Sequence, residues 1–315
     1  MRLCLALCFA ATLVGAVRAD CDACLDGHCY KKHLLPGTSD RYGAVHRGTN
    51  TLYHYNKNGD FEETIVQCNL TTATCSDSAK ISGMVDLTVD QRTGDVYGTY
   101  FTNVGIYKVD LVRNKKVLWV PVTEVWLLVF KDKLYYTDGF GGGIYVFENG
   151  VTTRLAGTAK YNNIKDLIVD RNNDIYFYNY KNNGRYLNKL SRGVIYESGF
   201  WDDHTFQMTV DKDDNAIFID ENTRAVYRLT DGQLVEIGAV GDWTNRPLFD
   251  RDNNMIYYIF NHNNEIKAWH FKRDRRVHCA TSSLGRTRTI AETYVSEEDD
   301  NINDNTESGI DTSLQ

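Results

Sequence analysis

The feature that most constrains this chain is a pattern that recurs six times at intervals of about 40 residues. Each unit contains a short apolar run that ends in Val or Phe, and Asp commonly follows it. Successive runs lie 44, 40, 40, 41 and 39 residues apart. A spacing this regular indicates a repeat architecture. The runs end at Val45, Val89, Val129, Val169, Val210 and Phe249.

Each apolar run is followed by a polar turn and then by a stretch rich in Tyr, Ile and Phe. Gly94–Tyr97 and Asn173–Tyr176 are examples. Asp, Asn and Gly favour hairpin turns because they tolerate positive φ or bond their own backbone. Two further strand-like runs complete a unit, as at Ala225–Leu229 and Leu234–Ile237. Four short strands per unit, without helical periodicity, predict an all-β, six-bladed β-propeller with four-stranded blades.

The sixth unit supplies only three strands before it ends near Cys279. The run Cys29–Leu35 precedes the first unit and has no other place in the repeat. We therefore expect this N-terminal strand to complete the last blade, so that the two chain ends pair and close the ring.

The first residues predict the compartment. Arg2, the apolar run Leu3–Val17 and the small-residue exit Val17-Arg18-Ala19 are typical of a cleaved signal peptide. No later segment is apolar enough to span a membrane. We expect a signal peptide at 1–19, a single propeller at 20–280 and an acidic tail at 281–315, in a secreted, extracellular protein.

Six cysteines follow the predicted signal peptide. An even number in an oxidising compartment favours disulfides over free thiols or a metal site. Cys68 and Cys75 flank a short hairpin loop and should pair locally. Ring closure would bring Cys279 near Cys21, Cys24 or Cys29, and the two that remain would then pair with each other.

The charge distribution excludes one class of partner. The formal net charge is −7, and no basic stripe suggests nucleic acid. The tail holds eight Asp or Glu against Arg286 and Arg288. It has few large apolar residues, so it cannot bury enough surface to offset the entropy of ordering, and we expect it to be disordered.

Candidate binding residues lie three positions before each apolar run ends. This register predicts a ring around one mouth of the channel, and the loops into the fifth and sixth blades add two tryptophans. Aromatic faces and a guanidinium would suit a flat polar molecule. The alternative is that these aromatics pack between blades. The predicted ring is Tyr42, Asp86, Trp126, Asp166, Gln207 and Arg246, with Trp201 and Trp243 beside it.

Catalytic motifs are absent from the sequence: it contains no nucleophile elbow, no HExxH and no phosphate loop. Asp86, Asp166 and Glu124 could hold calcium in a channel, as in propeller lactonases, but Trp126 and Arg246 in the same ring argue against it. The repeated Asp-x-Asn-Asn runs are better explained as turns than as calcium loops. We therefore expect no metal and no cofactor.

One modification site is predicted. Asn69-Leu70-Thr71 is the only N-x-Ser/Thr sequon, and it lies on the expected hairpin loop between Cys68 and Cys75. In a secreted protein such a position is a candidate for glycosylation.

Three segments resemble the ommochrome-binding proteins of moths: Cys29–Leu35, Val125–Thr137 and Phe249–Tyr257. The resemblance extends at family level from about Cys21 to Cys279. It implies a haemolymph carrier for ommochromes, which are tryptophan-derived aromatic pigments bearing carboxylates and an amine. The family supplies no residue-level binding motif, so the ring above remains an inference from the sequence.

The function predicted first is therefore a non-enzymatic extracellular carrier that binds an ommochrome-type pigment at the channel mouth as a monomer. An extracellular protein-interaction propeller is the second hypothesis. A calcium-dependent lactonase-like hydrolase is the third.

Overall fold

The computed structural model is built of β-strands, and its described residues contain no helix. None of them therefore forms a helix that could cross a membrane. The predicted signal peptide lies outside the described residues. The structure describes residues 21–36, 43–58, 62–80, 83–100, 103–122, 125–138, 142–161, 163–181, 184–200, 206–240, 245–260, 266–279, 287–289 and 293–294.

Three antiparallel sheets of four strands follow one another along the chain, each built from consecutive strands. The first sheet contains β3 (Gly43–His46), β4 (Thr51–Asn58), β5 (Glu62–Asn69) and β6 (Thr74–Lys80). The second contains β7 (Met84–Val89), β8 (Val96–Tyr100), β9 (Asn103–Asp110) and β10 (Lys115–Val120). The third contains β11 (Val125–Phe130), β12 (Leu134–Asp138), β13 (Ile144–Glu148) and β14 (Val151–Arg154).

The fourth sheet gains a strand from the C-terminal segment. It contains β15 (Ile164–Val169), β16 (Ile175–Lys181), β17 (Gly184–Ser191) and β18 (Val194–Phe200), and β27 (Thr293–Tyr294) pairs with β18.

The remaining strands form one sheet of ten, in which two groups of four are joined by β1. One group is β19 (Phe206–Val210), β20 (Ala216–Asp220), β21 (Ala225–Thr230) and β22 (Gln233–Val240), with β26 (Thr287–Thr289) paired to β22. The other is β23 (Asn245–Phe249), β24 (Met255–Phe260), β25 (Ile266–His278) and β2 (His28–Leu34), and β1 (Ala23–Leu25) lies between β2 and β22.

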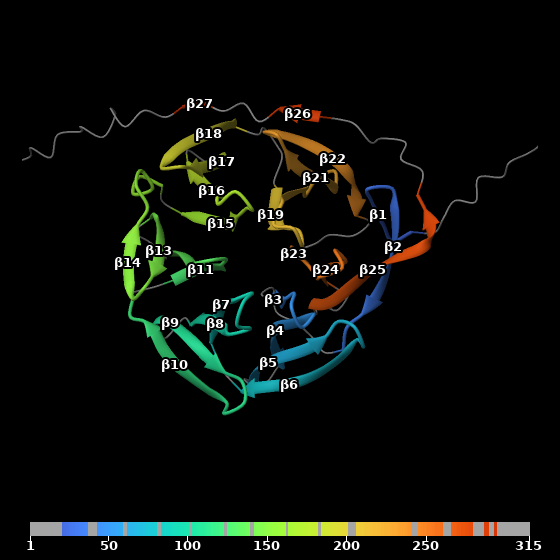
Figure 1. Ribbon diagram of the computed structural model, residues 1–315, viewed down its shortest axis with the longest axis horizontal. Helices are drawn as coiled ribbons and strands as arrows, with labels where there is room; N and C mark the ends of the chain where they lie inside the picture. Colours follow the sequence, from blue (N-terminus) through green and yellow to red (C-terminus); the bar gives the residue numbers. More distant parts are fainter. Residues whose placement is uncertain are drawn as a thin grey trace, which may run out of the picture.

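These sheets are arranged around a central axis, so the predicted all-β propeller with four-stranded antiparallel sheets is confirmed (Figure 1). The first strand of each group is innermost. The innermost strands contact one another in chain order, and β23 contacts β3 to complete the circle. These strands are β3, β7, β11, β15, β19 and β23.

The N-terminal strand closes the circle as expected. Figure 1 shows β2 beside β25, and the register pairs Tyr30 with Arg273 and Leu34 with Trp269. The sequence did not reveal that β1 continues this closure. β1 pairs on its other edge with β22, where Ala23 lies opposite Val240.

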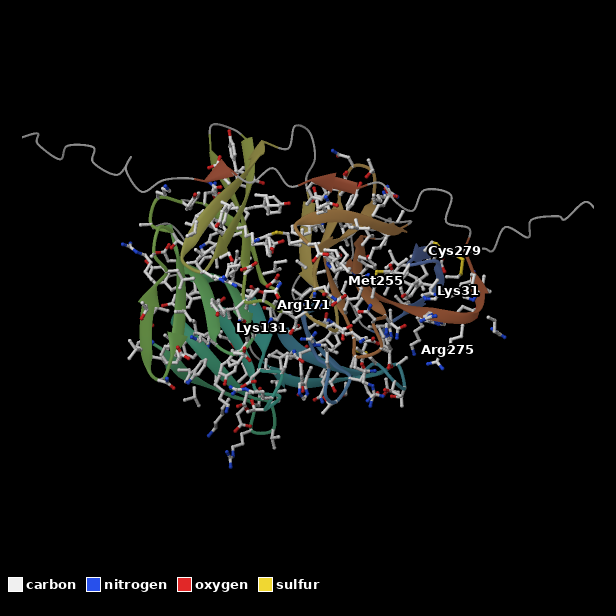
Figure 2. All side chains as sticks on the ribbon, turned by 45° about the horizontal axis from the view of Figure 1, so that its top comes forward. Lys31, Lys131, Arg171, Met255, Arg275 and Cys279 are labelled. Atoms are coloured by element: carbon white, nitrogen blue, oxygen red, sulfur yellow. A yellow bond between two sulfur atoms is a disulfide. The ribbon has the colours of Figure 1, made fainter. Side chains whose placement is uncertain are left out.

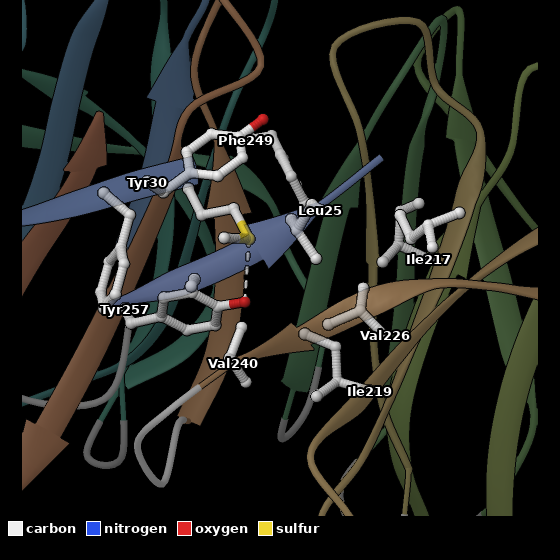
Figure 3. Packing of buried hydrophobic residues seen from close by; sticks show 12 residues of the cluster. Leu25, Tyr30, Ile217, Ile219, Val226, Val240, Phe249 and Tyr257 are labelled. Atoms are coloured by element: carbon white, nitrogen blue, oxygen red, sulfur yellow. Dashed lines mark hydrogen bonds between the residues drawn. The ribbon is translucent and has the colours of Figure 1, made fainter. Parts of the chain in front are cut away.

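The hydrophobic core lies between neighbouring sheets. Figure 3 shows the cluster in which Leu25 and Tyr30 of the N-terminal strands pack with Ile219, Val240 and other residues of the β19–β25 region. The ring closure is therefore sealed by apolar burial as well as by backbone hydrogen bonds, since each large apolar side chain that is fully buried contributes about 1.5–3 kcal/mol.

Three disulfides match the expected pattern. Cys68 pairs with Cys75 across the β5–β6 hairpin, where their Cα atoms are 4.0 Å apart. Cys24 is the N-terminal cysteine that bonds Cys279, and Cys21 bonds Cys29. The Cys24–Cys279 bridge thus joins the two ends of the described propeller.

Gly238 allows β1 to approach β22 closely. Its φ is +149°, and a Cβ at this position would overlap the carbonyl oxygen of Cys24. We expect Gly238→Ala to lower the free energy of unfolding by about 2–3 kcal/mol, from overpacking and backbone strain. Urea denaturation followed by tryptophan fluorescence measures the loss.

Gly232→Ala is the matched control. Gly232 also has a positive φ, of +75°, but nothing lies within 4 Å of a Cβ placed there. This substitution should lower the free energy of unfolding by only about 1 kcal/mol, which is the cost of placing Ala in the left-handed conformation. Equal losses in the two variants would show that the contact between β1 and β22 does not restrict position 238.

Candidate functional site

A cavity of about 220 Å³ lies on the propeller axis and is lined by all six innermost strands. Its wall is largely apolar and includes Leu87, Leu128, Leu167 and Met208. At one end it reaches the turns that follow the innermost strands, which add Arg47, Gln91, Arg92, Lys131, Asp132 and Asp214.

At that end of the cavity, charged side chains meet across the axis. We call the cluster of Arg47, Lys131 and Asp214 the floor. Arg47 bonds the Asp214 carboxylate at 2.6 Å and donates to the carbonyl oxygen of Asp211 at 2.8 Å. The Lys131 ammonium lies 3.6 Å from the other Asp214 oxygen. The floor thus joins the turns after β3, β11 and β19.

Lys131 also donates to the carbonyl oxygen of Asp170. Figure 2 shows Lys131 and Arg171, the residue that follows Asp170, toward the middle of the molecule. The repeat pattern of the sequence did not predict the floor. The sequence did contain a signal for a cationic cluster at this end. Lys or Arg closely follows the apolar run in several units, as at Arg47, Lys131, Arg171, Lys212 and Arg251.

The innermost strands begin at the opposite end, where the sequence predicted the mouth; Asp86, Trp126, Asp166 and Gln207 lie there and do not line the cavity itself. β-bulges or register irregularities interrupt four of these strands: between Met84 and Asp86, between Val125 and Leu127, between Ile164 and Asp166, and between Asn245 and Leu248. A bulge turns side chains out of the regular alternation, and bulges are common beside active sites. They fix where the polar residues of the mouth point.

Asp86 and Asp166 join neighbouring innermost strands. The Asp86 oxygens accept backbone N–H groups of Leu87 at 2.9 Å and of Leu128, on the next strand, at 2.8 Å. Asp166 repeats the arrangement, with Leu167 at 2.9 Å and Met208 at 3.2 Å. Asp86 is fully buried, whereas Asp166 is partly exposed. Only Asp166 therefore combines this fixed geometry with access to solvent.

Trp126 lies one position away from its predicted place. Phe130 pairs with Leu134 at the end of β11, as Val89 pairs with Val96 at the end of β7. Counting back from these pairs, Leu127 is the equivalent of Asp86. Trp126 is instead the residue at the bulge and is 37% exposed.

Other polar groups extend the mouth on both sides of Asp166. The Lys165 ammonium lies 5.1 Å from the centre of the Trp126 ring, within the range of a cation–π contact. Gln207 is buried, and its amide donates to Glu221 at 3.5 Å. The structure therefore brings Trp126, Asp166 and Gln207 of the predicted ring to one side of the mouth, with Lys165 and Glu221 in addition.

Five predicted residues cannot be placed in this group. Tyr42, Trp201 and Trp243 lie outside the described residues, as does Glu124 of the calcium alternative. Arg246 belongs to β23, but its side chain lies outside the described part of the structure.

A metal does not fit the described part of the mouth. Among the described residues, no three His, Cys, Asp or Glu side chains come together as ligands. The Asp86 oxygens already accept backbone hydrogen bonds. Calcium takes six to eight oxygen ligands, so these residues do not form a calcium site.

The Asp-x-Asn-Asn runs are turns, as predicted. Asp170 accepts the backbone N–H of Asn172 at 2.8 Å and that of Asp174 at 2.9 Å, and the same pattern recurs at Asp211 and Asp250. Burial raises the pKa of the Asp170 carboxyl, and these N–H donors partly oppose the shift.

Asn69 is the exposed last residue of β5, and the rest of its sequon begins the turn that follows. Its side-chain oxygen accepts the backbone N–H groups of Thr71 at 2.9 Å and Thr72 at 3.1 Å. Glycosylation at Asn69 stays a prediction.

Comparison with known proteins gives matches in structure only. No protein-family model and no curated protein sequence matches the chain. A gluconolactonase from Xanthomonas campestris has a TM-score of 0.59 at 13% identity, with 82% of this chain and 97% of that chain covered. Regucalcin, a calcium-binding protein from Agrobacterium tumefaciens, has a TM-score of 0.57 at 14% identity, with 77% and 95% covered.

A third neighbour broadens the comparison. The β-propeller domain of a trilobed protease from Pyrococcus furiosus has a TM-score of 0.51 at 12% identity, with 79% of this chain and 80% of that chain covered. At such identities the likeness establishes the propeller fold alone.

These neighbours correct the leading function predicted from the sequence. A non-enzymatic pigment carrier was the first hypothesis, and these neighbours contradict both that hypothesis and the expectation that the protein is not an enzyme. The gluconolactonase and regucalcin propellers favour the lactonase-like alternative instead. None of them bears on the resemblance to ommochrome-binding proteins, which stays a prediction.

Proposed function

We propose that this protein is a lactonase-like hydrolase that opens a small polar cyclic ester at the mouth of the channel. The observation that carries the proposal is the Asp166 carboxylate, which is partly exposed and held by two backbone N–H groups. The structural likeness to gluconolactonases supports the class of reaction.

Asp166 is the proposed general base. Its carboxylate takes a proton from water while the water oxygen attacks the ester carbonyl, and the ring C–O bond then breaks. The departing alkoxide recovers that proton, so one water is consumed and one hydroxy acid is formed. General base catalysis of this kind contributes about 10²–10⁴-fold to a rate. The two backbone donors fix the carboxylate before the substrate arrives, which reduces the entropic cost of reaction.

Lys165 and Trp126 are the proposed substrate contacts. The Lys165 ammonium is exposed and lies next to Asp166 in the chain, where it would stabilise negative charge on the carbonyl oxygen. The exposed face of Trp126 would pack against the apolar face of a sugar-like ring. The Gln207–Glu221 pair supplies hydrogen bonds to hydroxyl groups on the other side.

We also propose the number of blades and the location of the protein. Six innermost strands in a closed circle support a six-bladed ring, with β1 joining the last two blades into one sheet. Three disulfides support an oxidising, extracellular location.

The test is hydrolysis of D-glucono-1,5-lactone by the full chain, followed as acid release in a pH-stat. We expect Asp166→Asn to lower kcat/KM by about 100-fold, because the amide cannot accept the proton. Asp213→Asn is the matched control, since Asp213 is exposed and its side chain pairs with Lys212 near the floor.

Three results would overturn the proposal. The first is a folded wild-type chain that hydrolyses neither this lactone nor other five- or six-membered sugar lactones. The second is full activity in Asp166→Asn. The third is complete loss of activity with a chelator and recovery with calcium, which would assign water activation to a metal rather than to Asp166.

A further inference from the structure

The C-terminal segment lies along the outer edges of two sheets. β26 pairs with β22, where Leu234 lies opposite Arg288, and β27 pairs with β18, where Tyr196 lies opposite Tyr294. Figure 1 shows both short strands outside the outermost strands β18 and β22. The sequence predicted that this segment is disordered, yet these five residues are described as strands that extend existing sheets.

The two covered edges differ in composition from the other outer strands. β18 and β22 contain no Lys or Arg, and each carries a single Glu. The outer strands β6, β10 and β14 each contain an exposed cation, Lys80, Lys115 and Arg154 among them. Within the described residues, no C-terminal strand pairs with these three.

This difference has a physical meaning. An edge strand presents unpaired N–H and C=O groups, and natural proteins protect such edges with charges, above all Lys, or by covering them. β6, β10 and β14 are protected by charge. β18 and β22 lack that protection and are covered in part instead. β27 covers β18 at Tyr196 and Glu197, and β22 is covered by β26 at Gln233–Val235 and by β1 at Gly238–Val240.

We propose that the C-terminal segment is an edge guard, and that the outer edges of β18 and β22 form a self-association surface when it is displaced. The partner is a second copy of this chain, whose uncovered edge pairs antiparallel with the same edge across a twofold axis. Within the described residues, the segment pairs with β18 at two positions and with β22 at three, so few backbone pairs have to break for it to be displaced. This proposal does not depend on the hydrolase function.

The test compares the full chain with the double variant Arg288→Pro/Thr293→Pro. Proline removes a backbone donor and disfavours strand pairing, so it releases both short strands while the acidic tail stays attached. We expect a concentration-dependent monomer–dimer equilibrium by sedimentation velocity in the variant and a monomer in the wild-type chain. Hydrogen exchange at Glu197 and Leu234 in the dilute variant should rise about tenfold or more.

Two further variants make the result specific. Asp304→Pro places a proline in the same acidic tail outside both strands and should behave as wild type. Glu197→Lys/Val235→Lys, added to the double proline variant, restores an edge charge and should return the protein to a monomer.

Two outcomes contradict the edge guard. One is a double proline variant that stays monomeric at every concentration, with unchanged exchange at β18 and β22. The other is a dimer that the added lysines do not weaken, which would place the association elsewhere on the molecule.

Discussion

Replacing Cys24 and Cys279 together by Ala is expected to lower the free energy of unfolding by about 5 kcal/mol. The bridge joins cysteines that are 255 residues apart, so it constrains almost the whole unfolded propeller. In the loop-entropy description, the stabilisation by a disulfide grows with the logarithm of the loop that it closes. Urea denaturation at pH 7 of the variant and the wild-type chain measures the difference.

The bridge between Cys21 and Cys29 is the internal control. Its cysteines are only 8 residues apart, so replacing both by Ala should cost about 2.5 kcal/mol. Both bridges lie in the region where β1 and β2 close the ring, so they share most of their surroundings. Equal losses for the two would show that the pairing of β2 with β25 closes the ring without help from the covalent bond.

Acidification from pH 6.5 to pH 4 is expected to destabilise the protein by about 3 kcal/mol through one buried side chain, His54. His54 is 1% exposed, and burial lowers its pKa to about 4 from the ordinary value of 6.5. In the unfolded chain this imidazole binds a proton near pH 6.5, while in the folded protein it stays neutral until about pH 4.

The sign follows from proton binding. Between pH 6.5 and 4 the unfolded state binds more protons at this residue than the folded state. Stability is therefore lost as the pH falls, and the contribution levels off below pH 4. Above pH 6.5 the imidazole is neutral in both states and His54 has no effect.

Urea midpoints at pH 7, 5.5 and 4 test this expectation. His54→Gln should remove most of the loss, because glutamine does not titrate. His33→Gln should keep the loss, because His33 is exposed on β2. An equal pH dependence in His54→Gln and wild type would assign the acid sensitivity to other groups.

Local sequence patterns predicted much of the fold. The six apolar runs are the innermost strands, and after four of them an Asp bonds the backbone of its own turn, at Asp90, Asp170, Asp211 and Asp250. These features recur because every sheet packs on its neighbours in the same way. Ring closure predicted from the same repeat that one N-terminal cysteine bonds Cys279, but only the structure identified it as Cys24.

The candidate site was predicted less completely. Asp86 and Asp166 were identified at the mouth, but their hydrogen bonds to the neighbouring innermost strands were not. Trp126 was placed one position from where β11 puts it, because a counted spacing cannot detect a β-bulge or a shorter turn. The floor was missed since Arg47, Lys131 and Asp214 come from three separate units and meet only across the axis.

The sequence by itself determined the repeat, the strand-and-turn pattern within each unit and the pairing of the chain ends, because these depend on residues close together or on a periodicity that can be counted. Only the tertiary structure decided which carboxylate is accessible, which residues cross the channel and which edges the C-terminal segment covers. Those properties arise where different units meet in space, and the distances between units are not encoded in any local pattern.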